Sequence, residues 1–265
     1  MPSFPLGRSD QQRQGLRVPA MKPSRVEQAA RNNAIWCDTV CRAHGVPGEL
    51  LDTVWINRRP SPPYYPNLVT LRDTRHSWAE LNGVRQLIEG FLPESCGVKD
   101  SFCTLDLTAL GFELLFDASW IWCEALPDQE IDQSSRFQWV SVASSAELSA
   151  WEAAWSLGTG SARGPGKQSQ FPPSLLGDRT VLVLAGVQGQ HLVAGGIANC
   201  TEGVVGLSNV FGPPGDEQSV WAGLAATVGA AFPAVPLVGY QQAHSLDGPL
   251  ACGFEVVGAL RVWLR

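Results

Sequence analysis

The sequence predicts an α+β protein with a mixed, mainly antiparallel sheet that is flanked by helices. Three short apolar segments in the C-terminal half are joined by only three residues each, which favours antiparallel hairpins: 180–187, 191–199 and 203–211. An amphipathic pattern recurs at helical spacing from Val220 to Phe232, and the strand-like segment 235–240 follows it. A strand reached through a helix lies parallel to the strand before that helix, so the sheet should be mixed.

Apolar periodicity and helix start and stop signals predict the other elements. Helices are expected at 26–45, 78–91 and 144–157, and a second turn or short helix is expected at 47–51. Strands are expected at 67–71, 101–107, 114–123, 137–143 and 259–264. Both halves of the chain should therefore contain helices as well as strands.

The chain is expected to form two ordered halves. Residues 1–24 are polar and proline-rich and predict a disordered tail, and the charged segment 128–136 predicts a linker between the halves 25–127 and 137–265. Gly111-Phe112-Glu113 in the first half is echoed by Gly253-Phe254-Glu255 in the second, each ahead of a strand-like segment that contains tryptophan. Two readings fit this echo: a degenerate tandem pair of related halves, or one domain with an unrelated α/β extension.

Composition excludes several classes of protein. The chain has 265 residues, 45% of them hydrophobic, which is enough to fill a sizeable core. A formal net charge of −6 and the lack of a basic run disfavour nucleic acid as a partner. The seven cysteines are an odd number, no signal-peptide pattern precedes them, and no apolar stretch is long enough to span a bilayer. These features predict reduced thiols in a cytoplasmic protein with no membrane partner.

The order of elements in the second half resembles that of the GNAT acyltransferase superfamily. An antiparallel meander is followed by a loop, a helix, a parallel strand and a closing Gly-Phe-Glu segment, and the resemblance covers residues 137–265. It implies a GNAT-like fold, with the first half as a second, degenerate GNAT-like copy if the halves are a tandem pair. It also implies transfer of an acyl group, acetyl in the first place, from acetyl-CoA or another acyl-CoA to the amine of a small molecule by direct attack, without a metal.

The resemblance also places the donor site. Strand 203–211 should splay from strand 235–240 to admit the pantetheine arm of coenzyme A, and the loop and helix N-terminus that follow should hold the pyrophosphate. The residues expected to bind the donor are Val210, Phe211, Gly212, Gly215, Gln218, Ser219 and Val220. The Arg or Gln and the two Gly of the family pattern correspond here to Asp216, Ser219 and Trp221, which do not match. A helix capped by its own carboxylates, without a phosphate, is the alternative.

Candidate catalytic residues surround the end of the splaying strand. Ser208 and Asn209 interrupt an apolar run there, and we expect Asn209 to position substrate; a structural hydrogen bond to the next strand is the alternative. Many family members have a Tyr that protonates the leaving thiolate, but Pro249 stands at that position. Tyr240, His244 and Asp247 are the nearest substitutes, and a loop or packing role is the alternative for each. Glu202, in the preceding hairpin turn, is a candidate general base, and a solvated turn carboxylate is the alternative.

Other functions stay open at this stage. Cys37, Cys41 and His44 share one face of the first helix, but three ligands without a C-x-x-C partner favour packed thiols over a metal site. A non-catalytic GNAT-like protein that binds a ligand or partner is one alternative function. Acyl or aminoacyl transfer from a carrier protein or an aminoacyl-tRNA is another, and the acidic balance weighs against tRNA.

Overall fold

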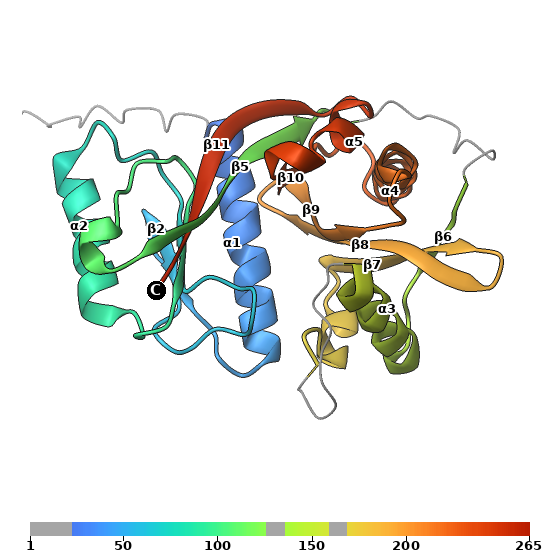
Figure 1. Ribbon diagram of the computed structural model, residues 1–265, viewed down its shortest axis with the longest axis horizontal. Helices are drawn as coiled ribbons and strands as arrows, with labels where there is room; N and C mark the ends of the chain where they lie inside the picture. The colour runs from blue at the N-terminus through green and yellow to red at the C-terminus, as the bar shows by residue number, and fades with distance from the viewer. Residues whose placement is uncertain (1–22, 126–135, 159–168) are drawn as a thin grey trace, which may run out of the picture.

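One eleven-stranded sheet runs through the chain, in the order β1-β2-β3-β4-β11-β5-β10-β9-β8-β7-β6 (Figure 1). The computed structural model describes residues 23–125, 136–158 and 169–265, so nearly all of the expected tail and linker lies outside the described residues. The first half contributes α1 Arg25–Ala43, β1 Glu49–Leu50, β2 Val54–Ile56, β3 Leu68–Thr70, α2 Trp78–Phe91, β4 Gly97–Asp100 and β5 Glu113–Cys123. The second half contributes β6 Gln138–Ser141, α3 Ser145–Gly158, β7 Val181–Gln188, β8 His191–Thr201, β9 Val204–Phe211, α4 Glu217–Ala231, β10 Leu237–Gln241, α5 Asp247–Leu250 and β11 Glu255–Leu264.

The expected α+β class and mixed sheet are confirmed. β9 and β10 are parallel and are joined through α4, as the sequence predicts, and the meander β7-β8-β9 is antiparallel. The helices expected at 26–45, 78–91 and 144–157 correspond to α1, α2 and α3. Ser24 begins α1 with a capping box, because its hydroxyl accepts from the Glu27 N–H while the Glu27 carboxylate accepts from the Ser24 N–H.

The two halves exchange their last strands. β5 of the first half lies between β10 and β11, and β11 of the second half lies between β5 and β4. From this central pair outward, both sides of the sheet show an antiparallel pair, then a parallel pair that encloses a helix, then another antiparallel pair. Gly111 and Gly253, which precede β5 and β11, have φ of 78° and 85°, in the left-handed region that favours glycine. This mirrored arrangement is what tandem halves would produce; their common origin stays a prediction.

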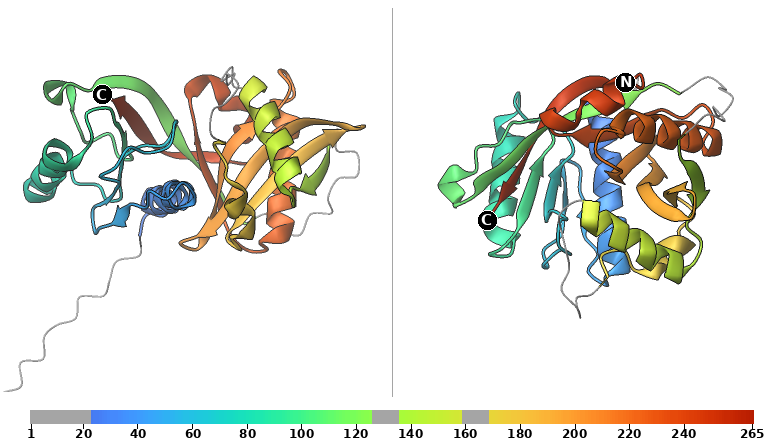
Figure 2. Two further views of the ribbon diagram at one scale, coloured as in Figure 1. Left: turned by 90° about the horizontal axis from the view of Figure 1, so that it is seen from below. Right: turned by 45° about the vertical axis from the view of Figure 1, so that its right-hand side comes forward.

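Two helices cover each face of the sheet. On β7 and β8, Val183 and Ile197 pack against α3 and α1, whereas Leu184 and Ala198 pack against α4. The first half follows the same alternation, since α2 packs on one face of β2 and β3 and α1 packs on the other. α1 contacts β3, β5, β8, β9, β10 and β11, and it crosses the strands near the middle of the molecule (Figure 2). α1 therefore joins the two halves into one core.

Buried amides fasten α1 to the second half. Asn32 Nδ2 donates to the Asn199 carbonyl oxygen at 3.0 Å and to Thr201 Oγ1 at 2.9 Å, and Asn199 Nδ2 donates to the Asn32 carbonyl oxygen at 3.3 Å. Gly206 of β9 lies directly beneath, where a Cβ atom would be 2.0 Å from Asn32 Oδ1. Only glycine leaves room for this network, so position 206 fixes how closely α1 approaches the sheet.

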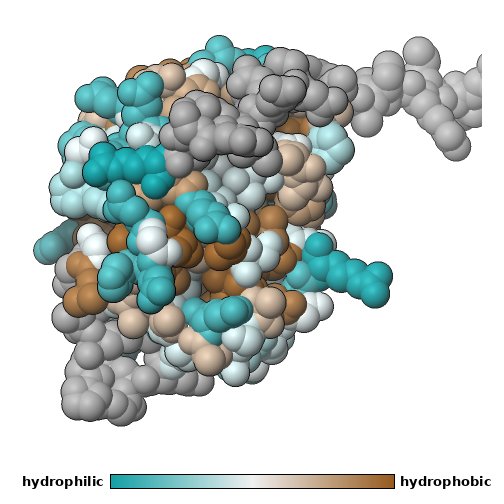
Figure 3. Space-filling model, turned by 90° about the vertical axis from the view of Figure 1, so that its right-hand side faces the viewer, coloured by the Kyte–Doolittle hydropathy of each residue, from teal (hydrophilic) through white to brown (hydrophobic). Residues whose placement is uncertain are grey.

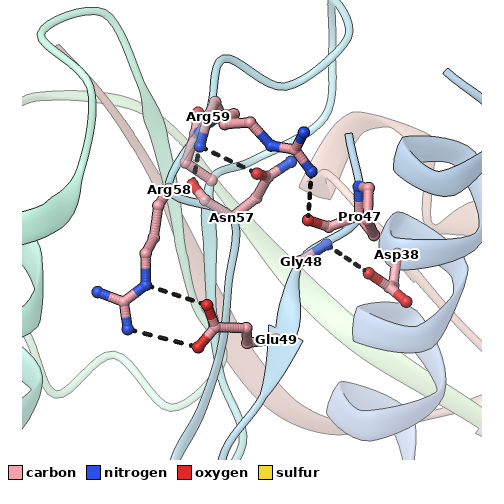
Figure 4. Close-up of polar contacts among 8 residues, drawn as sticks. Asp38, Pro47, Gly48, Glu49, Asn57, Arg58 and Arg59 are labelled. Carbon is pink, nitrogen blue, oxygen red and sulfur yellow. Dashed lines mark hydrogen bonds and ion pairs between the residues drawn. The ribbon is translucent and has the colours of Figure 1, made fainter. Parts of the chain in front are cut away.

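The prediction of a turn or short helix at 47–51 is wrong, because this segment contains strand β1. Glu49 pairs with Ile56 and Leu50 with Trp55 in an antiparallel hairpin. Polar contacts hold the hairpin in place: Asp38 Oδ1 of α1 accepts from the Gly48 N–H at 2.8 Å, and Arg58 forms an ion pair with Glu49 (Figure 4). Pairing with β2, which the sequence pattern did not reveal, outweighs the local helix signal.

The strand expected at 101–107 is also wrong. The strand in this region is β4, which ends at Asp100, and the chain then turns. The buried Asp100 carboxylate accepts from the N–H groups of Phe102 at 3.3 Å and Leu105 at 2.8 Å, which bends the backbone away from the sheet. Phe102, Leu105 and Leu107 are buried all the same, and Leu105 and Leu107 have the two-residue spacing of a strand.

β6 ends the sheet at the second half, and its side chains are mainly exposed. On the face of the molecule at this end, polar residues are interspersed among apolar ones (Figure 3). Polar side chains around an edge strand discourage pairing with other chains. Within the described residues, no helix has the length and apolar character needed to cross a membrane.

Candidate functional site

β9 and β10 separate partway along their length. They pair only at Val205 with Leu237 and at Gly206 with Val238, whereas β10 stays paired with β5 as far as Gln241. The C-terminal parts of β9 and β10 are therefore not hydrogen-bonded to each other. This opening between two parallel strands exposes backbone and side chains that a closed sheet would cover.

A β-bulge shapes β9 at the opening. Ile197 of β8 pairs with Ser208 and Gly195 pairs with Phe211, so Asn209 and Val210 together oppose the single residue Gly196. Asn209 has φ of 53°, a left-handed conformation that Asn tolerates better than most residues. The extra residue of a bulge lies outside the regular ladder, which is the kind of site at which a backbone N–H can be left for a ligand.

Two cavities lie beside the opening and share two of their lining residues. One, of about 260 Å³, lies between α1, α3 and the ends of β9 and β10, and we call it the aromatic cavity. Its lining includes Trp36, Tyr64, Tyr65, Trp155 and Tyr240. The other, of about 190 Å³, lies between the end of β9 and the start of α4, and we call it the α4 cavity. Val210 and Gln241 line both cavities, so a molecule in each could meet its neighbour at these residues.

The structure brings together most of the residues predicted to be catalytic. Ser208, Asn209 and Tyr240 all line the aromatic cavity. Glu202 lies at the other end of β9, in the hairpin turn, and forms an ion pair with Arg31 at 3.0 Å. The predicted general-base role of Glu202 is not supported by this placement, because its carboxylate is engaged with α1 and does not line either cavity.

The first half supplies residues of the aromatic cavity that the sequence did not single out. Asn33 and Cys37 come from α1, Tyr64 and Tyr65 from the proline-rich segment after β2, and Lys99 from β4. β11 and β5 lie between β4 and β10 in the sheet, and the side chains of Lys99 and Tyr240 meet across these two strands, a proximity with no local sequence signal. One feature of the sequence could have drawn attention to Lys99: it is the only lysine between residues 23 and 166.

Two backbone N–H groups of the loop before α4 form hydrogen bonds within the loop itself. Of the residues predicted to bind the donor, Val210, Phe211, Gly212 and Val220 line the α4 cavity, whereas Gly215, Gln218 and Ser219 do not. Glu217 Oε1 accepts from the Gly215 N–H at 3.0 Å, and the Asp216 N–H donates to the Pro213 carbonyl oxygen at 3.1 Å. Asp216 also forms an ion pair with Arg136. The Gly215 and Asp216 N–H groups are thus used within the loop and two carboxylates lie nearby, which disfavours a pyrophosphate at this part of the loop.

The cysteine and histidine side chains of α1 have other partners. Cys37 Sγ lies 3.9 Å from Asn33 Oδ1, Cys41 Sγ lies 4.0 Å from Ser61 Oγ, and His44 Nε2 is hydrogen-bonded to the Gln170 carbonyl oxygen. Across the described ranges, no cluster of three or more His, Cys, Asp or Glu side chains is arranged to hold a metal ion. Burial raises the pKa of the Cys37 thiol to about 12, so this thiol faces the aromatic cavity in its neutral form.

Cysteine labelling should follow burial. At pH 8 we expect the three partly exposed cysteines, Cys103, Cys200 and Cys252, to react with an aromatic disulfide reagent well before the four buried ones. The measurement is mass spectrometry of labelled peptides over time, with guanidinium-unfolded protein, in which all seven should react, as the control. Fast labelling of Cys37 in the folded protein would show that the aromatic cavity holds a thiolate.

Solved structures resemble the whole arrangement. A GCN5-related N-acetyltransferase from Kribbella flavida matches 89% of this chain and 95% of its own at a TM-score of 0.52 and 14% identity. A protein described as an acetyltransferase of the GNAT family, from Novosphingobium aromaticivorans, matches 89% of this chain and 97% of its own at a TM-score of 0.53 and 10% identity. The chain has a GNAT-like fold. Because these matches cover both halves, the GNAT-like arrangement is not confined to residues 137–265.

The other comparisons do not indicate what activity this GNAT-like chain has. A functionally unknown conserved protein from Staphylococcus epidermidis matches 83% of this chain and 94% of its own at a TM-score of 0.54 and 14% identity. No family model and no curated protein matches the sequence. At 10–14% identity the structural likeness establishes the fold alone, so function has to be argued from the opening and its two cavities.

Proposed function

We propose that this GNAT-like chain is an N-acyltransferase that transfers an acyl group, acetyl in the first place, from a pantetheine thioester to a small-molecule amine. The observation that carries the proposal is that the α4 cavity and the aromatic cavity share Val210 and Gln241 as lining residues, beside the bulge at Asn209. Two reactants held in adjacent cavities need no covalent enzyme intermediate. The structural neighbours named as acetyltransferases favour the same chemistry.

The chemistry follows from this arrangement. The thioester arm enters through the α4 cavity, and the neutral amine approaches from the aromatic cavity, where Ser208 and Tyr240 position it beside the bulge at Asn209. The amine nitrogen attacks the carbonyl carbon, and a tetrahedral oxyanion forms that a bulge N–H stabilises. The C–S bond then breaks, and the proton lost by the amine is taken up by the leaving thiolate. The products are an amide and a free thiol.

The loop before α4 favours a particular kind of donor. Because the Gly215 and Asp216 N–H groups are used within the loop, we propose that the pantetheine arm, rather than the pyrophosphate of coenzyme A, supplies most of the donor's binding energy. An acyl group on the phosphopantetheine of a carrier protein would present the same arm, so acyl transfer from a carrier protein is the second candidate function.

A comparison of acetyl-CoA with acetyl-pantetheine as donors tests both the acyltransferase proposal and the proposal that the pantetheine arm supplies most of the donor's binding energy. We expect acetyl transfer to a panel of amines, detected by thiol release and by the mass of the amide, with kcat/KM for acetyl-pantetheine within about tenfold of that for acetyl-CoA. A tenfold limit corresponds to about 1.4 kcal/mol, less than a well-bound pyrophosphate should contribute. A much larger preference for acetyl-CoA would refute the statement about the loop. No transfer from acetyl-CoA, acetyl-pantetheine or an acyl carrier protein would refute the acyltransferase proposal.

A further inference from the structure

The aromatic cavity is lined by a buried lysine, Lys99, that pairs with no carboxylate of the described residues. The Lys99 residue is 4% exposed, and its Nζ forms no ion pair within the part of the chain that the structure describes. Nζ donates to Asn33 Oδ1 at 2.7 Å and lies 4.3 Å from the centre of the Tyr240 ring. An ammonium group has three N–H donors, and one hydrogen bond with one ring contact leaves a donor for the cavity. A buried charge of this kind is costly unless something compensates it.

Two hydroxyl groups of the same cavity also lack partners. The Tyr65 hydroxyl oxygen and Ser208 Oγ are both buried, and neither has a partner with good hydrogen-bond geometry among the described residues, although the Trp36 side chain lies beside the Tyr65 hydroxyl. Burial raises the pKa of the Tyr65 phenol well above its ordinary value, against a smaller lowering by Trp36, so the phenol stays protonated and can donate. Buried polar groups are nearly always hydrogen-bonded in folded proteins. A cation and two unpartnered hydroxyls on one cavity therefore indicate a ligand with several acceptor atoms.

We propose that the acceptor amine also carries a carboxylate, which binds Lys99 together with the hydroxyls of Tyr65 and Ser208. A carboxylate has two oxygens and about four lone-pair sites, enough for all three donors. A phosphate dianion would need more positive charge than one lysine supplies. The net charge of −6 shows that Lys99 does not belong to a general excess of cations.

The cavity walls define the rest of the acceptor. Trp36, Tyr64 and Trp155 present aromatic surface to the space between Lys99 and the bulge. A volume of about 260 Å³ suits a compound the size of an amino acid with an apolar side chain. The substrate class is thus amino acids and related amino-carboxylates with an apolar or aromatic side chain. The amine part of this inference rests on the proposed acyltransferase function, whereas the carboxylate part rests on Lys99, Tyr65 and Ser208.

Binding without a donor tests the carboxylate separately from catalysis. The probes are N-acetyl derivatives of phenylalanine, tryptophan, leucine and methionine, each compared with the N-acetyl derivative of the corresponding decarboxylated amine by calorimetry. We expect at least one carboxylate to bind about ten- to a hundredfold more tightly than its decarboxylated partner. This preference should vanish in Lys99→Met and persist in Arg261→Met, which removes an exposed cation that pairs with Asp117 on the surface. No preference in the wild-type protein, or a preference that survives in Lys99→Met, would overturn the inference.

Measurements of stability and of acyl transfer distinguish the carboxylate inference from the proposed function. Since the charge of Lys99 is uncompensated when the cavity is empty, Lys99→Met should unfold in urea at the same or a higher midpoint than the wild-type protein. If Lys99→Met fails to fold, Lys99→Gln, which keeps a donor for Asn33, takes its place in the binding experiment. Carboxylate binding without acyl transfer would refute the proposed function and leave this inference standing. Transfer that is equally fast to amines with and without a carboxylate would refute this inference and leave the proposed function standing.

Discussion

Replacing Gly206 with alanine is expected to lower the free energy of unfolding by about 3 kcal/mol. The new methyl group would lie 2.0 Å from Asn32 Oδ1 and 2.6 Å from Asn199 Oδ1, and both side chains are buried. Either α1 moves away from β9 or the Asn32 hydrogen bonds to the second half break. Urea unfolding followed by tryptophan fluorescence measures the change in stability.

Gly83→Ala is the matched control for this substitution. Gly83 lies within α2, and a Cβ atom there meets nothing within 4 Å. The same added methyl group should therefore stabilise the protein by about 0.5–1 kcal/mol, because alanine favours helix more than glycine does. If Gly206→Ala is as stable as the wild-type protein, the amide network does not fix the position of α1.

Asn209→Val is expected to reduce kcat by about a hundredfold or more, the loss typical of removing one oxyanion donor. Valine is strongly disfavoured at φ of 53°, so the bulge should rearrange and the free N–H should return to the ladder. Asn209→Gly keeps the left-handed conformation without a side chain, so its kcat should stay within a few-fold of the wild-type value. Initial rates of acetyl transfer at saturating donor measure both variants.

The pair of variants at position 209 separates backbone from side chain. Equal losses in Asn209→Gly and Asn209→Val would show that the Asn209 amide group itself contacts substrate, as the sequence alone predicts. Full activity of the Asn209→Val variant would show that the bulge does not contribute to catalysis. Circular dichroism and urea unfolding serve as controls for folding, and Asn209→Gly should be at least as stable as the wild-type protein because glycine relieves the strain at this position.

The sequence predicted most of the helices and strands, but it did not predict how distant strands pair. α2 has the predicted limits, and the parallel pair β9 and β10 follows from the helix between them. The exchange of β5 and β11 could not be predicted, because it depends on pairs such as Asp117 with Arg261 that no local pattern marks. At 101–107 the buried Asp100 carboxylate, not side-chain alternation, decides the backbone path.

The sequence allowed prediction of the site residues in the second half of the chain, but not of those in the first half. Ser208, Asn209 and Tyr240 belong to β9 and β10, whose order along the chain indicates the opening, and all three line the aromatic cavity. Lys99 and Tyr65 reach the same cavity from the first half, so recognising them requires the three-dimensional arrangement of both halves. The misfit of Asp216 with the family pattern was visible in the sequence. The structure adds its physical reason, since the loop uses its own N–H groups.

Hydrogen–deuterium exchange with and without millimolar acetyl-CoA tests the central claim most directly. If the opening between β9 and β10 admits the acyl donor, exchange should slow in segments 207–212 and 237–241 together. Segments 73–78 and 101–103, around a separate surface cavity of about 420 Å³, should exchange unchanged. Protection confined to that cavity, or no protection in 207–212 and 237–241, would contradict the claim that the acyl donor binds at this opening.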